Sequence, residues 1–165
     1  MTESLTYIIR VDSPLGRIEL MGDGARLTSL AIARADVLPH DERPERGAPV
    51  LARAHRQLDE YFAGSRRAFT IPVAYGGTLF QQRVWQRIAA LRWGEHISYR
   101  ELGNDIGRPE ACRAIGGAVA ANPLPIILGC HRVLSSRGRV IGYTGGDGIP
   151  TKLWLLHHEA IMLAA

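Results

Sequence analysis

The sequence predicts an α/β (α+β) protein with two lobes: a small N-terminal lobe with a β-sheet and a helix, and a mostly helical C-terminal lobe containing a helix-turn-helix. Three observations lead to this expectation. Runs rich in Ile, Val and Leu flank a Pro/Gly turn within the first 33 residues. From Pro49 onward, apolar residues recur with the spacing of helices. A short helix, a tight glycine turn and a second helix are then expected within residues 98–121.

Three strands are expected to open the N-terminal lobe, which we assign to residues 1–76. The strand candidates are the runs at 6–11, 17–22 and 27–33. Ser13-Pro14-Leu15-Gly16 joins the first two as a hairpin, because Pro and Gly favour a tight turn. Residues 36–47 are polar and contain Pro, which predicts a surface loop.

A helix is expected to complete this lobe, beginning at Pro49 and stopped by Gly64. Its apolar residues fall on one face: Val50, Leu51, Ala54, Leu58, Tyr61 and Phe62. Residues 69–75 are a candidate for a further strand. Gly76-Gly77 then marks the boundary with the C-terminal lobe, residues 77–165.

The C-terminal lobe shows two capping boxes, Thr78 with Gln81 and Ser98 with Glu101. The first predicts a helix to about Leu91, and the second a short helix that Gly107 ends. The next helix is expected to begin at Pro109 and run to about Ala121, with an inward face of Cys112, Ile115 and Val119. A last helix begins at Pro150, with the apolar side Leu153, Leu156, Ala160 and Ile161.

Two neighbouring glycines, Gly116 and Gly117, interrupt the second helix of the helix-turn-helix. An interior glycine costs a helix about 1 kcal/mol relative to alanine. The pair therefore suggests a close approach to the backbone, by DNA or by a neighbouring helix; the sequence leaves both open. The helix lacks side chains that read base edges, which favours shape or minor-groove recognition over sequence readout.

The net charge of +4 lies wholly in the C-terminal lobe, where nine Arg and one Lys face six acids. A basic half suggests a polyanionic partner. Two cysteines make no disulfide framework, and no apolar run has the length of a membrane span. We therefore expect a reduced, cytoplasmic protein with no membrane association and no metal site.

The candidate nucleophile is Cys130, which ends an apolar, Pro-containing run from Asn122 and precedes His131 and Arg132. Thiolate is the reactive form of cysteine, and a neighbouring His or Arg lowers the thiol pKa by stabilising the anion. A small buried hydrophobe is the alternative interpretation. The local sequence does not decide between them.

Several motifs occur together and in order: Ser98-Tyr99, Arg113-Ala114-Ile115-Gly116-Gly117-Ala118, Asn122-Pro123, Cys130-His131-Arg132-Val133 and Gly142-Tyr143-Thr144-Gly145-Gly146. With further segments along nearly the whole chain, they resemble the O6-alkylguanine-DNA alkyltransferases, or methylated-DNA–protein-cysteine methyltransferases. The resemblance implies DNA repair by single-turnover transfer of an alkyl group from O6-alkylguanine, and from O4-alkylthymine, to a cysteine after base flipping, with no cofactor.

The resemblance also implies roles for individual residues. The catalytic group would be Cys130 as acceptor, His131 and Glu159 as proton relay, and Tyr143 as donor to the base. Contacts to the minor groove of double-stranded DNA would come from Arg113, Tyr99, Ala114, Gly116, Gly117 and Ser98. The substrate pocket and hinge would use Asn122, Val133, Thr144 and Gly145. Cys112 is expected to be structural. The protein is expected to be a monomer, with cooperative assembly on DNA left open.

One position departs from the family pattern, because Gly129 stands where the family has proline before the cysteine. Glycine removes two backbone restraints, so we expect a less preorganised cysteine loop and slower transfer. Two other functions are alternatives to alkyl transfer. One is a DNA-binding protein that recognises alkylated bases with little or no transfer, and the other is a helix-turn-helix regulator.

Overall fold

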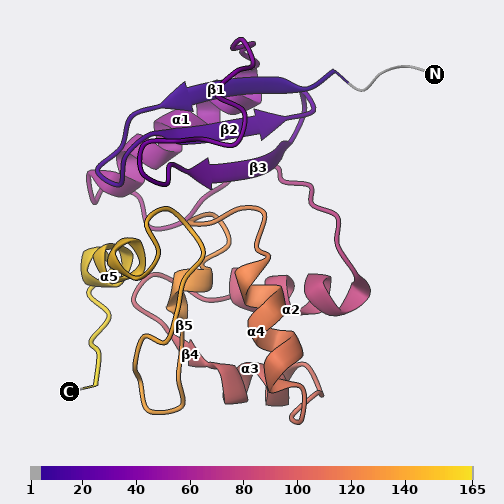
Figure 1. The fold of residues 1–165 in the computed structure, drawn as a ribbon, viewed down its shortest axis with the longest axis vertical. Helices are drawn as coiled ribbons and strands as arrows, with labels where there is room; N and C mark the ends of the chain where they lie inside the picture. Colours follow the sequence, from indigo (N-terminus) through magenta and orange to yellow (C-terminus); the bar gives the residue numbers. More distant parts are fainter. Residues whose placement is uncertain (1–4, 165) are drawn as a thin grey trace. The chain divides into compact units, whose positions relative to one another are not determined.

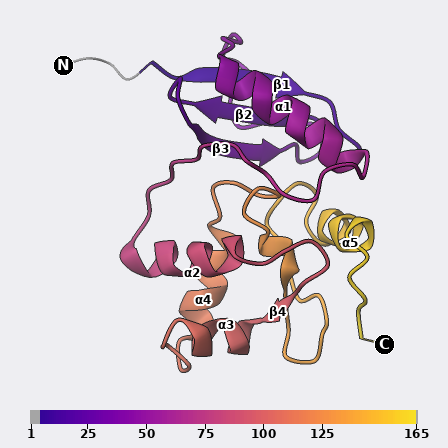
Figure 2. The same cartoon turned by 180° about the vertical axis from the view of Figure 1, so that it is seen from behind.

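A computed structural model describes residues 5–164 of the chain. The chain divides into two compact units, with the boundary between Tyr75 and Gly76, and each is described by itself. The ribbon is drawn in Figure 1 and from behind in Figure 2. Within the described residues, no helix is long and apolar enough to cross a membrane.

The first unit is an antiparallel sheet with a helix on one face, as predicted. Strands β1 (Tyr7–Val11), β2 (Ile18–Gly22) and β3 (Leu27–Ile32) pair in sequence order. Helix α1 (Pro49–Phe62) lies across one face of this sheet (Figure 2). Apolar side chains fill the space between them, and among the fully buried ones are Leu20, Leu27, Leu51 and Leu58.

Two predictions for this unit were wrong. Residues 69–75 form no strand, only an isolated bridge between Val73 and Leu27. Pro72 has no N–H with which to extend a ladder, although its carbonyl accepts from the Leu27 N–H at 2.8 Å. On α1, Phe62 is only half-buried, and the fully buried Gln57 joins the inner face because its amide binds Thr70 on both sides.

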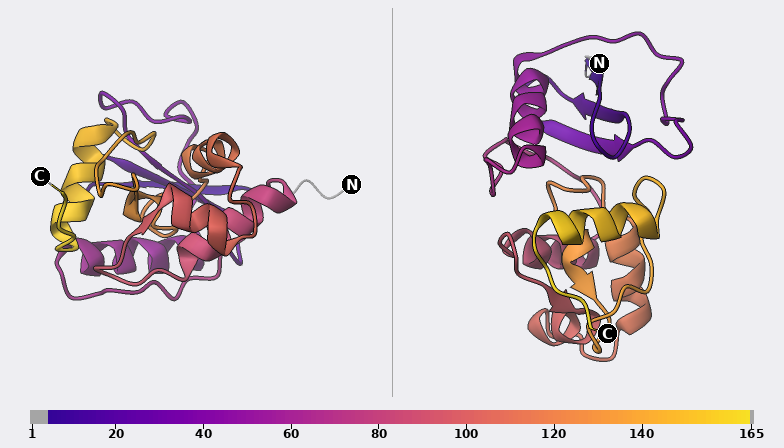
Figure 3. Two further views of the ribbon diagram at one scale, coloured as in Figure 1. Left: turned by 90° about the horizontal axis from the view of Figure 1, so that it is seen from below. Right: turned by 90° about the vertical axis from the view of Figure 1, so that its left-hand side faces the viewer.

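The second unit is mostly helical. Its elements are α2 (Leu79–Ala89), β4 (Ile97–Ser98), α3 (Tyr99–Asp105), α4 (Cys112–Ala120), a one-turn 3₁₀ helix η1 (Cys130–Arg132), β5 (Val133–Leu134) and α5 (Ile149–His158). Both predicted capping boxes are formed, at the starts of α2 and α3. The strands β4 and β5 pair in parallel. Figures 1 and 3 show α4 and α5 on opposite sides of β5.

Two helix faces in this unit differ from the prediction. Helix α4 begins at Cys112 rather than Pro109, and Cys112 is exposed, because Ile115, Ala118 and Val119 form the inner face. In α5, Leu153 is 42% exposed, and Ala160, which lies after the helix ends at His158, is also exposed. The buried residues of α5 are Thr151, Lys152, Leu155 and Leu156.

Candidate active site

Cys130 is the first residue of η1 and is fixed by the loop that precedes it. Asn122 spans this loop: its Nδ2 donates to the Leu128 carbonyl at 2.7 Å, and its Oδ1 accepts from the Leu124 N–H at 2.9 Å. Within the loop, the buried Ile126 has a φ of +74°. A β-branched residue in the left-handed region is strained and persists only when its surroundings hold it. The amide of Asn122 is therefore placed to hold the cysteine loop closed.

The surroundings of the Cys130 thiol differ from those that the sequence suggested. Burial raises the pKa of Cys130, which is 4% exposed. The side chains of Asn122 and Tyr143 and the charge of Lys152 oppose this rise. At neutral pH the buried sulfur carries its proton, so reaction requires a base.

The candidate base is His131, which is fully buried. Its Nε2 lies 2.7 Å from Glu159 Oε2. Its Nδ1 is buried and has no hydrogen-bond partner among residues 5–164. Burial lowers the pKa of His131 below its ordinary value, so the ring is neutral. With Nε2–H directed at the carboxylate, the neutral ring presents Nδ1 as an acceptor.

Glu159, at the C-terminal end of α5, carries the negative charge behind His131. Burial alone would raise its pKa, but hydrogen bonds from His131 and Arg132 overcome this and lower the pKa to about 2. The Arg132 guanidinium contacts both carboxylate oxygens, with Nε to Oε1 at 2.7 Å and Nη2 to Oε2 at 3.1 Å. The carboxylate is therefore ionised and shared between two neighbours.

Lys152 is a site residue that the sequence analysis missed. Its side chain is buried, and Nζ donates to the carbonyl oxygens of Val133 at 2.6 Å and Gly142 at 3.2 Å. Burial lowers the pKa of Lys152 to about 8, and the Cys130 charge opposes this. The spacing of Lys152, Leu155, Leu156 and Glu159 (i, i+3, i+4, i+7) was the available signal for an inward helical face.

A cavity of about 500 Å³ is lined by residues that act on the Cys130 thiol, although Cys130 itself does not line it; the size is typical of pockets for small organic groups. Tyr99, Tyr143 and Lys152 line it, and each of them interacts with Cys130. Other walls come from α4 and from the loop after β5, and include Gly116, Val119, Ser136, Ile141 and Thr144.

Two of the predicted pocket residues, Gly145 and Thr144, help to position the side chains and loop that form the cavity wall. A Cβ on Gly145 would stand 2.6 Å from the Tyr143 ring. Only glycine therefore lets the ring take its place. Thr144 donates from Oγ1 to the Ala120 carbonyl at 2.8 Å, which connects this loop to α4. Val133 does not line the cavity: its side chain is fully buried, and its carbonyl binds Lys152.

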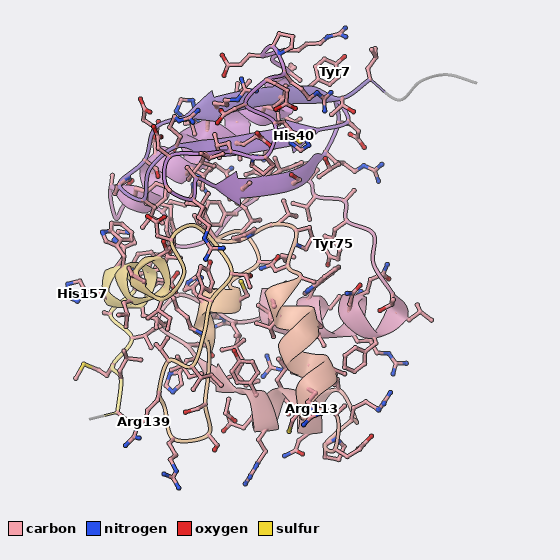
Figure 4. The ribbon with its side chains drawn as sticks, in the orientation of Figure 1. Tyr7, His40, Tyr75, Arg113, Arg139 and His157 are labelled. Carbon is pink, nitrogen blue, oxygen red and sulfur yellow. The ribbon has the colours of Figure 1, made fainter. Side chains whose placement is uncertain are left out.

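The predicted DNA-contacting residues lie on one exposed side of the helix-turn-helix. Arg113, Ala114 and Gly117 are exposed on α4, and Arg113 lies near the N-terminal end of this helix in Figure 4. A Cβ on Gly116 or Gly117 would meet nothing within 4 Å. Close packing of a neighbouring helix therefore does not account for this glycine pair.

Two further predicted residues belong to the start of α3. Ser98 caps α3 by accepting from the Glu101 N–H at 3.0 Å. Tyr99 is the first residue of α3 and is half-buried beside the cavity. Within the described part of the chain, no three His, Cys, Asp or Glu residues lie close enough together to hold a metal ion.

Comparison with known proteins identifies the family. Residues 5–75 match the ribonuclease-like domain of 6-O-methylguanine DNA methyltransferase, and residues 79–161 match its DNA binding domain. The methylated-DNA–protein-cysteine methyltransferase of Mycobacterium leprae is 44% identical over 90% of this chain and 89% of its own length. The constitutive Bacillus subtilis protein of that name is 36% identical over 95% and 97%.

A solved structure agrees with these matches. The crystal structure of Mycobacterium tuberculosis OGT in complex with DNA superposes with a TM-score of 0.83, at 40% identity, over 93% of this chain and 92% of that one. Both halves of the chain and its fold thus agree with one family. The chain belongs to the 6-O-methylguanine DNA methyltransferase family.

Proposed function

We propose that the protein repairs DNA by transferring an alkyl group from O6-alkylguanine to Cys130. The observation that carries the proposal is a buried cysteine whose thiol is acted on by Tyr143 and Lys152 from the wall of a cavity of about 500 Å³, followed in the chain by a buried His131 that is bonded to Glu159. The names of the relatives and the family membership support the same reaction. Residues 77–165 would form the transferase lobe and residues 1–76 its supporting lobe.

The chemical step moves one alkyl group and one proton. Cys130 Sγ attacks the alkyl carbon; the S–C bond forms as the C–O6 bond breaks, and guanine leaves with the electron pair. The thiol proton passes through a water to His131 Nδ1, the buried atom without a partner among the described residues. That proton then neutralises the guanine anion. The products are a thioether and an ordinary guanine, so each molecule acts once without a cofactor.

The remaining site residues would stabilise the charges that develop during transfer. Lys152, Asn122 and Tyr143 favour the thiolate, since each lowers the pKa of Cys130. The Tyr143 hydroxyl would also donate to the departing base. Glu159 stabilises the imidazolium that His131 becomes. O4-alkylthymine offers the same kind of alkyl carbon on an exocyclic oxygen and would be a second substrate.

Double-stranded DNA would approach the exposed side of α4 through its minor groove. The bare surface at Gly116 and Gly117 permits a close approach of the backbone to the groove. Extrusion of a base costs a few kcal/mol; Arg113 would fill the gap that the base leaves, and Tyr99 would push on the target phosphate. Ser98 and Ala114 would add contacts beside them.

Exposed arginines surround the cavity on this side. Arg100 lines it, Arg113 follows the lining residue Cys112, and Arg137 follows the lining residue Ser136. These three arginines form no ion pair within residues 5–164. Free guanidinium groups are suited to phosphate contacts. They would bind the backbone on either side of the extruded base.

Intact-mass analysis after incubation with an O6-methylguanine duplex tests the proposal. We expect a gain of one methyl group on Cys130, no gain in Cys130→Ala, and an undiminished gain in Cys112→Ala. Binding of the duplex with no change in mass would instead establish the rival function, an alkylated-base-binding protein. A helix-turn-helix regulator would show strong preference for one sequence among unrelated duplexes.

A further inference from the structure

Arg132 is a buried guanidinium that binds Glu159 of the relay and one backbone carbonyl. Its side chain is 9% exposed. Besides its two bonds to Glu159, its Nη1 donates to the Leu91 carbonyl at 2.8 Å. Three fixed contacts leave this side chain a single position. Arg132 thereby holds both oxygens of the Glu159 carboxylate, and Oε2 is shared with His131 Nε2.

The glycine before the cysteine leaves room for this guanidinium. Gly129 has a φ of −71°, which other residues, including proline, adopt freely. Its backbone conformation therefore does not require glycine. A Cβ at this position would lie 3.1 Å from each of three Arg132 atoms, Cδ, Nε and Nη1. An added Cβ would require those atoms to shift by a few tenths of an ångström, and the bonds to Glu159 and Leu91 oppose that shift.

We propose that Arg132 is a positioning residue of the alkyl-transfer relay, acting through Glu159 on His131. The absence of a side chain at Gly129 leaves the space that the Arg132 side chain occupies. The inference rests on the proposed function, because it concerns the residue that removes the thiol proton. It gives Gly129 a role in addition to the expected loosening of the cysteine loop. Arg132 orients the carboxylate, and its charge opposes protonation of His131 in the resting protein.

The charged groups around His131 determine whether its ring is neutral or protonated. The charged groups that act on His131 are Glu159, which favours the protonated ring, and Arg132 and Lys152, which oppose it. With Arg132 in place, the single carboxylate already has a cation, so the ring stays neutral and able to accept a proton. Without Arg132, Glu159 has only His131 as a strong partner, and the ring protonates at higher pH.

The test is a comparison of Arg132→Met, Arg132→Lys and wild type by single-turnover methyl transfer from pH 5.5 to 8.5. In Arg132→Met the loss of rate at pH 6 is expected to exceed the loss at pH 8 by roughly fivefold or more. NMR titration of the labelled His131 ring in the free protein is expected to show its midpoint raised. Arg132→Lys keeps the charge and loses the bidentate fork; we expect a lower rate with the midpoint unmoved.

The outcomes separate this inference from the function on which it rests. A wild-type protein that takes up no methyl group would overturn the proposed function, whereas the His131 titration needs no DNA. An unmoved His131 midpoint in Arg132→Met, or a wild-type rate in Arg132→Lys at every pH, would overturn the positioning role. If the Met variant does not fold, the Lys variant decides.

A second comparison concerns the space at residue 129. Gly129→Ala is expected to slow transfer several-fold, since the added Cβ displaces the anchored guanidinium. Gly47→Ala is the matched control, because a Cβ there meets nothing within 4 Å, and we expect the wild-type rate. Equal rates in Gly129→Ala and Gly47→Ala would remove Gly129 from the proposal.

Discussion

Replacing Asn122 with alanine tests how the strained cysteine loop is held. The substitution removes two hydrogen bonds, from Nδ2 to the Leu128 carbonyl and from the Leu124 N–H to Oδ1. Each such bond contributes about 0.5–1.5 kcal/mol net, so the loss is about 1–3 kcal/mol. The left-handed φ of Ile126 stores strain of similar size, about 1–3 kcal/mol. The amide thus offsets most of the strain that the loop carries.

Urea unfolding and single-turnover transfer measure the two consequences separately. We expect Asn122→Ala to lower the free energy of unfolding by about 1–3 kcal/mol. Transfer is expected to slow by roughly ten- to a hundredfold, because the sulfur loses both its position and a hydrogen-bond donor. Asn104→Ala, an exposed asparagine in α3, should change stability by less than about 0.5 kcal/mol. If Asn122→Ala matches this control in stability and transfers at the wild-type rate, the loop is not held by the amide.

Three further predictions follow from buried and exposed charges. Lys152→Met should raise the pKa of Cys130 and slow its reaction with iodoacetamide at pH 8 by roughly tenfold, the effect of losing a charged partner worth at least about 1.4 kcal/mol; an unchanged rate contradicts the assignment. Arg137→Ala should reduce the salt dependence of binding to unrelated duplexes by about one phosphate contact; an identical slope excludes a phosphate contact. Stability should fall on acidification, first below about pH 6.5 and then below about pH 4.3, because the unfolded chain takes up protons on His131 and then on Glu159 at pH values where the folded protein, with both pKa values lowered, does not; urea midpoints that do not fall between pH 7 and pH 4 contradict this.

Local chemistry explains which parts of the fold could be predicted from sequence. The helix starts at Thr78 and Ser98 depend on bonds within four residues, and both capping boxes form. The face of α5 was misjudged at Leu153 because apolarity was followed without regard to Lys152. A buried lysine needs hydrogen-bond acceptors for its ammonium group, and the carbonyl oxygens of Val133 and Gly142 supply them here. Such partners belong to other segments, so the sequence around Lys152 shows only the helical spacing of its inward face and not the carbonyl groups that bind it.

The same limit applies to the thiol. The sequence placed Cys130 beside His131 and Arg132, and adjacency suggested that both act on the sulfur. Within the one-turn helix η1, consecutive side chains leave the backbone in different directions, so neighbours in sequence serve different partners. His131 and Arg132 both bind Glu159, 27 or more residues away. The groups that favour the thiolate come from three separate segments: Asn122 before the cysteine loop, Tyr143 in the loop after β5, and Lys152 in α5.

Burial also changes what the net charge means for DNA binding. Two of the ten cations of the second unit, Arg132 and Lys152, are buried with Glu159 and cannot reach phosphate. Others are neutralised locally, as Arg87 is by Asp105 at 2.8 Å. The charge available to a polyanion is therefore smaller than the sequence total, and Arg100, which lines the cavity, is part of it. If Arg100 and Arg113 contact phosphate as we propose, a modest total charge is sufficient, because a few exposed guanidinium groups near the cavity would bind the backbone on either side of the damaged base.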